Sequence, residues 1–262
     1  MKNPLWLRLF FLFVVMQALL VASAMVQPDL IKLVLPWDAS PLNARFIATL
    51  YGMGAISALL CMLAKSYTEV RISLIEIGLV TGALLLITIP HFGEFSADTF
   101  PYRWTIFYTI DPLVTGLILW RLRGRDSAPA GRNRLRWVFA GYGLVLGVAG
   151  IILLAWPELA ASLWPWSLPP ILGQVYSVFF LTFVVGALLA VREPRWAGVW
   201  VYLAANLGML LLVAIVSLVH FSRFKPGPTT WVWFTCCLVG IIAFAISLLW
   251  RRGRLSTKEA LS

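Results

Sequence analysis

The sequence predicts an all-α fold, a polytopic transmembrane helical bundle of eight helices built as two parallel four-helix repeats. Charged residues make up 12% of the 262 residues and hydrophobic residues 61%, with a mean hydropathy of +0.88. A soluble domain carries about 25% charged residues. Apolar stretches of about 20 residues recur along the chain, each long enough to cross a hydrocarbon core about 30 Å thick, and the chain matches itself at a fixed interval. This composition excludes a secreted disulfide scaffold, a cytosolic enzyme and a disordered tail.

Backbone groups in lipid must be satisfied internally, so each apolar stretch is expected to form a helix. In chain order the predicted helices are Leu5–Gln27, Ala44–Ala64, Ile72–Ile89, Trp104–Leu122, Trp137–Trp156, Pro170–Val191, Ala197–Val219 and Trp231–Trp250. Tryptophan brackets the fourth and the eighth, as is typical at the two membrane interfaces. Ser40 is expected to cap the second helix just before Pro41, because serine is a preferred N-cap and proline suits the first helical turn.

The first predicted helix also has features of a signal peptide, since a basic start and an apolar run precede Ala22-Ser23-Ala24. The apolar run is longer than the roughly 7–15 residues of a signal sequence. The equivalent segment of the second repeat, Trp137–Trp156, lies in the middle of the chain, where it could not be removed as a leader. We therefore expect this segment to stay in the protein as its first helix.

A shift of 129 residues aligns residues 28–104 with residues 157–233 without a gap. The matches include proline, tryptophan and histidine, which coincide by chance less often than leucine or alanine in an apolar sequence. Because each half holds an even number of helices, the halves should share one orientation and be related by a pseudo-two-fold axis along the membrane normal. The predicted division is a first repeat over 1–122, an arginine-rich cytoplasmic linker over 123–136, and a second repeat with a cytoplasmic tail over 137–262.

Basic residues indicate the orientation of the chain. Sixteen of the 21 Lys and Arg residues lie at the termini and in the connections between predicted helices 2 and 3, 4 and 5, and 6 and 7. Cytoplasmic loops are enriched in Lys and Arg. Both the N- and the C-terminus are therefore expected in the cytoplasm.

Proline and tryptophan gather before the second and the sixth predicted helices. We interpret Trp37 and Trp166, together with Trp104 and Trp233, as interfacial anchors, because tryptophan prefers the level of the lipid headgroups. A lid over an outward-facing site is the alternative interpretation of the two proline-tryptophan segments.

The first repeat contains the pattern Pro-Trp-x-x-x-Pro-Leu-x-Ala-Arg from Pro36 to Arg45. This pattern resembles a motif of uncharacterised bacterial integral membrane proteins, in which Trp-Pro-Trp precedes a Leu-Thr-Pro-Leu-x-Ala-Arg helix start. The second repeat departs from the motif, with Gln174 at the place of Arg45. The resemblance implies a multi-pass protein of the bacterial cell (inner) membrane without an assigned activity, and it supplies no catalytic residues.

The two histidines of the chain, His91 and His220, occupy equivalent positions in the two repeats. One hypothesis makes them a symmetric pair that binds a haem or another metal through neutral imidazole. The alternative is an interfacial anchor in each repeat, with a polar tip on an apolar body. The His-Phe-x-x-Phe sequence of both repeats favours the anchor, so the cofactor is unknown and none is favoured.

Asp111 and Glu76 are the acidic residues deepest in the predicted spans. Ionisable groups at such depth are costly and usually face the bundle interior or a water-filled cavity. We therefore interpret both, together with Asn206, as candidates for a substrate or ion pathway. The alternative for Glu76 is an ion pair with Arg8, and the alternative for Asp111 is structural pairing, with Arg103 as a weak candidate. The second repeat holds Ala and Gly at the equivalent positions, so such a site would be asymmetric.

Three functions remain open from the sequence. A non-catalytic accessory or scaffold membrane component is favoured, because the soluble loops are short and buried polar residues are few. A small transporter or channel with a site between the two repeats is one alternative, and a membrane haem or metal protein that uses the paired histidines is another. The sequence contains no pattern of catalytic residues, so an enzyme is not favoured. The expected partners are membrane lipids and a membrane protein, and nucleic acid is not expected.

Overall fold

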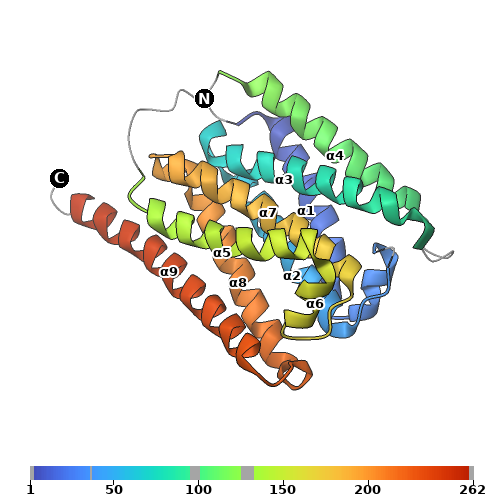
Figure 1. The fold of residues 1–262 in the computed structure, drawn as a ribbon. Coiled ribbons are helices and arrows are strands. Elements are labelled where there is room, and N and C mark those ends of the chain that lie inside the picture. The colour runs from blue at the N-terminus through green and yellow to red at the C-terminus, as the bar shows by residue number, and fades with distance from the viewer. Residues whose placement is uncertain (1–2, 36, 95–100, 125–132, 260–262) are drawn as a thin grey trace.

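The computed structural model describes residues 3–35, 37–94, 101–124 and 133–259. In this part of the chain the protein is all-helical, with 85% helix and no strands, which confirms the predicted fold class (Figure 1). The α-helices are α1 (Leu5–Ala22), α2 (Pro41–Leu63), α3 (Tyr67–Thr88), α4 (Pro101–Leu122), α5 (Arg136–Ala155), α6 (Pro157–Leu163), α7 (Pro170–Arg192), α8 (Trp200–Val219) and α9 (Pro228–Glu259).

Seven helices in the described part of the chain are long and apolar enough to cross a membrane, and they indicate a multi-pass membrane protein. They are α1, α2, α3, α5, α7, α8 and α9. The predicted segment Trp104–Leu122 falls on α4, which carries Asp111, Pro112 and Arg121 and is not among the seven. Eight spans therefore stay a prediction. The short helix α6 was not predicted.

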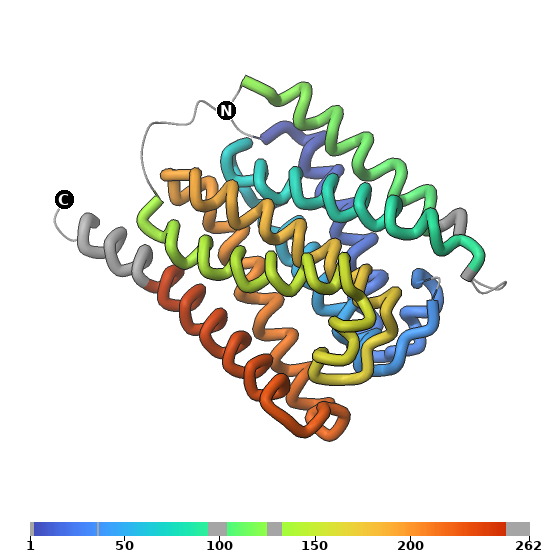
Figure 2. The backbone as a smooth tube through the Cα atoms, viewed as in Figure 1, coloured from blue at the N-terminus to red at the C-terminus, as the bar shows by residue number. Residues whose placement is uncertain are grey.

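Four helices, α2, α3, α7 and α8, form the centre of the bundle, and the other four long helices pack around them (Figures 1 and 2). α1 lies along α2 and α5 along α7, while α4 packs on α3 and α9 on α8. The first half of the chain meets the second mainly where α2 contacts α8 and where α3 contacts α7. We call the end at which α1, α3, α5 and α8 begin the termini end, and the opposite end, where α2 and α7 begin, the far end.

Capping groups fix where the central helices begin. α2 begins at Pro41, where the missing N–H of proline costs nothing. The Ser40 hydroxyl accepts a hydrogen bond from the Asn43 N–H at 3.4 Å, which confirms the predicted N-cap. α3 begins with a capping box of Ser66 and Glu69, in which each side chain satisfies a backbone N–H of the other residue.

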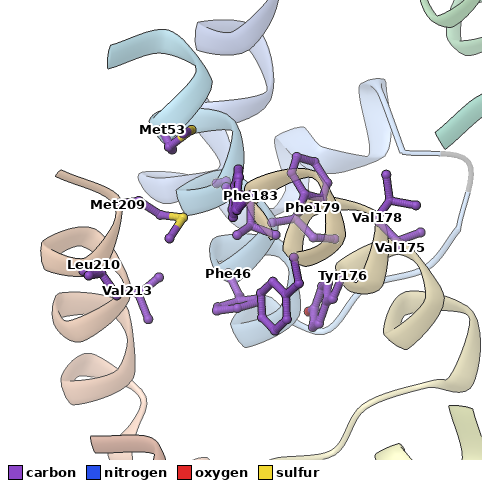
Figure 3. Close-up of a cluster of buried hydrophobic side chains, with 14 of the residues drawn as sticks. Phe46, Met53, Val175, Tyr176, Val178, Phe179, Phe183, Met209, Leu210 and Val213 are labelled. Atoms are coloured by element: carbon purple, nitrogen blue, oxygen red, sulfur yellow. The ribbon is translucent and has the colours of Figure 1, made fainter. Parts of the chain in front are cut away.

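Large apolar side chains fill the space between α2, α7 and α8 (Figure 3). α2 contributes Phe46 and Met53, α7 contributes Phe183, and α8 contributes Met209 and Val213, all of them buried. The two halves of the chain therefore share one apolar core.

The four tryptophans interpreted as interfacial anchors lie in the far end of the bundle, where they pack against other aromatic rings. Trp37 is 7% exposed, Trp104 3% and Trp166 1%, while Trp233 is half-buried. Their rings pack edge to face, with centroids 5.5 Å apart for Trp37 and Trp104 and 5.0 Å apart for Trp166 and Trp233. Such pairs stabilise a protein interior. The rings therefore hold the far end together, and their role as interfacial anchors stays a prediction.

Asn43 joins the first half of the chain to the second at the far end. Its side chain is 1% exposed. Asn43 Oδ1 accepts hydrogen bonds from Trp166 Nε1 at 2.7 Å and from the Tyr176 hydroxyl at 3.0 Å. Asn43 Nδ2 donates to the carbonyl oxygen of Ser167 at 3.1 Å. All three partners belong to the second half, so one amide satisfies several polar groups across the contact.

Replacing Asn43 by leucine, the residue at the equivalent position 172, should destabilise the protein. The change leaves the indole N–H of Trp166 and the hydroxyl of Tyr176 buried without an acceptor, at about 1–3 kcal/mol each. Thermal unfolding in detergent should show the loss. As a control, Thr109→Ala removes an exposed hydroxyl that bonds only within α4, and it should cost less than about 0.5 kcal/mol. Similar losses in both variants would contradict the role of Asn43.

Candidate functional site

Glu76 lies inside the bundle on α3, about 14 Å along the helix from its first residue at 1.5 Å per residue. Its side chain is 5% exposed and approaches α7, a central helix of the other half. The Oε1 atom of Glu76 is buried and has no hydrogen-bond partner among the described residues. An isolated buried carboxylate is very costly. This environment therefore favours a protonated carboxyl group or a bound cation.

Polar side chains of the second half lie near Glu76. The hydroxyl of Tyr142 on α5 donates to Asn206 Oδ1 on α8 at 2.6 Å, and Asn206 Nδ2 donates to the carbonyl oxygen of Tyr202 at 2.8 Å. The Tyr202 hydroxyl donates to the carbonyl oxygen of Phe183 at 2.8 Å. Both tyrosines lie within electrostatic range of Glu76. The structure thus brings Glu76 and the hydrogen-bonded group of Asn206 into one region.

Gly186 on α7 makes room for the Glu76 carboxyl group. A β-carbon at this position would collide with Glu76 Oε1 and with the ring of Tyr202. The close approach of α3 and α7 therefore depends on glycine. We call Glu76, Gly186, Tyr142, Tyr202 and Asn206 the Glu76 site.

The ion pair predicted between Glu76 and Arg8 does not form in the described part of the chain, which corrects that interpretation. Arg8 is exposed on α1, and α1 packs along α2. Its guanidinium therefore lies on the outside of the bundle, where water or headgroups can solvate it, while Glu76 is buried against α7.

Two polar contacts join α3 to the start of α8 at the termini end. The Glu193 side chain is 1% exposed, and its carboxylate binds Arg71 at 3.0 Å and Arg195 at 2.7 Å. Burial alone would raise the pKa of Glu193. Hydrogen bonds from Arg195 and the charges of Arg195 and Arg71 outweigh burial, so the pKa lies below its usual value. Beside this cluster, Trp200 Nε1 donates to Glu69 Oε2 at 3.1 Å.

The two histidines join the halves at the far end. Arg45 Nη1 lies 2.8 Å from His220 Nε2, and Gln174 Oε1 lies 3.1 Å from His91 Nε2. A guanidinium can only donate, so His220 Nε2 accepts and the ring is neutral. Arg45 Nε also donates to the carbonyl oxygen of Met25 at 3.0 Å. Each imidazole has its own partner on a different helix, so these contacts give no support to a shared haem or metal.

Asp111 belongs to a separate polar group in the first half. It is 5% exposed on α4 and lies beside Gln17 of α1. The hydroxyls of Tyr51 and Tyr108 hydrogen-bond to each other and lie within electrostatic range of Asp111. The predicted pathway is therefore divided, because Asp111 lies among helices of the first half while Glu76 faces the second.

Two sequence predictions fall outside the described residues. They concern the side chain of Arg103, a weak candidate partner of Asp111, and most of the arginine-rich linker, namely residues 125–132.

Within the described residues, no group of three or more His, Cys, Asp and Glu side chains could hold a metal ion. Comparison with models of protein families, with curated proteins and with solved structures gave no match. The resemblance of residues 36–45 to a bacterial membrane-protein motif therefore stays a prediction. A function must therefore be inferred from the contacts and the burial of residues within this chain.

Sequence reasoning missed the tyrosines and the glycine of the Glu76 site. Tyr142 and Tyr202 lie in or beside apolar spans, and a buried tyrosine hydroxyl usually finds a hydrogen-bond partner, so their positions were a usable signal. Nothing in the sequence distinguishes Gly186 from the other glycines of the chain. Only the packing of α3 on α7 shows its role.

Gly186→Ala should destabilise the protein, because the added methyl group would displace Glu76 and the ring of Tyr202. Overpacking of this kind costs about 1–3 kcal/mol. The matched control is Gly141→Ala on α5, where a β-carbon meets nothing within 4 Å. That change should leave stability unchanged or raise it by up to about 1 kcal/mol. Circular dichroism during heating in detergent measures both, and equal effects would show that α7 does not crowd Glu76.

Acidification should weaken the contact between Arg45 and His220. Burial lowers the pKa of His220, and the charges of Arg45 and Arg223 lower it further. The folded protein therefore prefers the neutral ring. As the pH falls through the ordinary histidine pKa of about 6.5, the unfolded chain takes up the proton first and the free energy of unfolding decreases. The unfolding midpoint should fall on acidification, and it should fall less in His220→Gln. Identical pH profiles for both proteins would refute this role of His220.

Proposed function

We propose that the protein is a small transporter of the bacterial cell membrane in which Glu76 carries a proton at the contact between two moving halves. The observation that carries the proposal is the buried Oε1 atom of Glu76, which has no hydrogen-bond partner in the described residues. Ionisable residues inside membrane spans are rare, and they mark proton relays and substrate pathways. A group of this kind at the contact of α3 with α7 is suited to respond when that contact opens.

A proton suits the Glu76 site better than a metal cation does. A cation such as Ca²⁺ takes about 6–8 oxygen ligands. The oxygens of Tyr142, Tyr202 and Asn206 are already engaged in hydrogen bonds, which leaves one carboxyl group as the free ligand. A protonated carboxyl group is neutral and can be buried at much lower cost than a carboxylate.

Polar contacts on both sides of the Glu76 site support a closed, occluded conformation. Glu193 and Arg71 join the halves at the termini end. Arg45 and His220 join them at the far end. In transporters with two repeats, one bundle rocks against the other around a fixed site. Opening either set of contacts in turn would expose Glu76 to one side of the membrane at a time.

We further propose that the halves are two parallel repeats. α2 and α7 begin and end at positions related by 129 residues. Trp104 Nε1 donates to Thr88 Oγ1 at 2.9 Å, and Trp233 Nε1 donates to Ser217 Oγ at 3.0 Å, a pair of hydrogen bonds related by the same shift. The two histidine contacts and the two tryptophan pairs are also related by the shift of 129 residues. Parallel repeats occur in known transporter folds.

The proposed orientation places the termini end of the bundle in the cytoplasm. The predominance of Lys and Arg in the connections at that end supports it, because such residues are retained on the cytoplasmic side.

An accessory or scaffold component of the membrane is the second candidate. α9 and α5 are only 17% and 22% buried in their most apolar windows, against 61% for α2 and α7. A membrane protein partner could cover these faces, but lipid covers them equally well in a transporter. Measurement of flux separates the two functions.

Glu76→Gln should abolish proton movement while leaving the fold intact, because glutamine keeps the shape of the side chain but cannot release a proton. Wild-type protein is reconstituted into vesicles that contain a pH-sensitive dye and a low-molecular-mass bacterial extract as the source of substrate. A potassium diffusion potential then drives proton entry. We expect flux with the wild type, and with Glu76→Gln only the rate of protein-free vesicles.

Glu158→Gln is the matched control, because Glu158 is exposed on the short helix α6. This variant should keep the wild-type flux. Infrared spectroscopy provides an independent measurement, since the carbonyl band of a protonated carboxylic acid should be present in the wild type and lost in Glu76→Gln. The band without any flux would refute transport and favour the accessory role, and the absence of the band would refute a protonated Glu76.

A further inference from the structure

A groove of about 290 Å³ runs along the seam between α1 and α4 in the termini half of the bundle. It is lined by Trp6, Phe10, Val114, Leu117, Ile118 and Arg121. α1 packs along α2 and α4 packs along α3, so each helix is held by a different neighbour. Side chains of α1 and α4 meet farther along the seam, where Gln17 lies beside Asp111 and the rings of Phe13 and Phe107 are 6.4 Å apart. The open part of the seam is therefore confined to the groove.

We infer that this groove binds one acyl chain of an anionic phospholipid, whose phosphate lies against Arg121. All the lining residues except Arg121 are apolar or aromatic, which suits a hydrocarbon chain. Leu117 is 59% exposed and Trp6 41% exposed, so the groove is open at the surface of the bundle. A lipid can therefore enter from the side.

The groove covers about two thirds of the depth of a single leaflet. On α4 it extends from Val114 to Arg121, which corresponds to about 10 Å of helix at 1.5 Å per residue. Half of a hydrocarbon core about 30 Å thick is about 15 Å. The groove would thus hold the part of an acyl chain next to the headgroup, and the end of the chain would extend beyond it.

The positive charge of Arg121 favours an anionic headgroup. Arg121 is exposed in the last turn of α4 and has no acidic partner among the described residues. Arg123 lies close by, with its guanidinium carbon 5.3 Å from the centre of the Trp120 ring. Basic pockets between membrane helices bind anionic headgroups, and each basic residue near the surface contributes about 1 kcal/mol. A phosphate would therefore supply the anion that Arg121 lacks.

The size of the groove favours a lipid chain over a helix of a partner protein. A helix with its side chains is about 10–12 Å across and would need a broad open face. The groove is bordered by two helices and presents six lining residues. A single flexible chain fills such a space without displacing either helix.

The test uses the whole purified protein in neutral detergent and measures the unfolding midpoint with added lipid. Phosphatidylglycerol should raise the midpoint of the wild type more than phosphatidylcholine does, and soluble glycerol phosphate should have no effect. Arg121→Gln should remove the difference between the two lipids. Leu117→Trp, which fills the groove, should remove the effect of both. Native mass spectrometry should show a bound phospholipid on the wild type and less on either variant.

Arg192→Gln is the control, since Arg192 is an exposed arginine at the same end of the bundle but on α7. It should keep the wild-type response. An equal loss in Arg192→Gln and Arg121→Gln would overturn the inference in favour of diffuse attraction. Stabilisation by glycerol phosphate alone would reduce the site to an anion site without an acyl chain. Photo-crosslinking from position 117 to a membrane protein and not to lipid would overturn it as well.

Discussion

A polar side chain inside a bilayer has no water to bind, so it must find its partner within the protein. This constraint determines how the two halves of the chain meet. Asn43 satisfies an indole and a phenol of the other half, and Arg45 reaches across to His220. At the opposite end Glu193, in the connection between α7 and α8, forms an ion pair with Arg71 of α3. The apolar core between α2, α7 and α8 supplies contact area, but these polar groups select one relative position of the halves.

Glu76 is the exception to this constraint, because its buried Oε1 atom has no hydrogen-bond partner among the described residues. Its neighbours Tyr142 and Asn206 satisfy each other, and Gly186 lets the carboxyl group approach α7. A residue that only stabilised the fold would be expected to share in such hydrogen bonds. A carboxyl group left without a partner costs stability, and such a cost is common at functional sites.

The helices themselves followed from the sequence because hydropathy and length decide which segments can cross a membrane. Each predicted segment falls on a long helix, and Ser40 caps α2 as its position next to Pro41 indicated. The direction of individual side chains could not be predicted in the same way. Helix rotation is set by packing, and a nearly uniform apolar segment has no polar face to reveal it. The sequence therefore indicated which end of the bundle holds Trp37 and Trp166, but not that both rings are buried against other aromatic rings.

The two halves differ at the positions that form the contact of Glu76 with Gly186, and the proposed proton site is asymmetric for this reason. Glu76 on α3 corresponds to Ala205 on α8, and Gly186 on α7 corresponds to Ser57 on α2 under the 129-residue shift. The α3–α7 contact thus combines a long carboxyl side chain with a glycine. The equivalent positions of the other two helices hold alanine and serine, and the Ser57 hydroxyl donates to Ser73 Oγ of α3 at 2.7 Å. Gly186 thus accommodates the carboxyl group where the two halves meet, as the proposed site between two repeats requires.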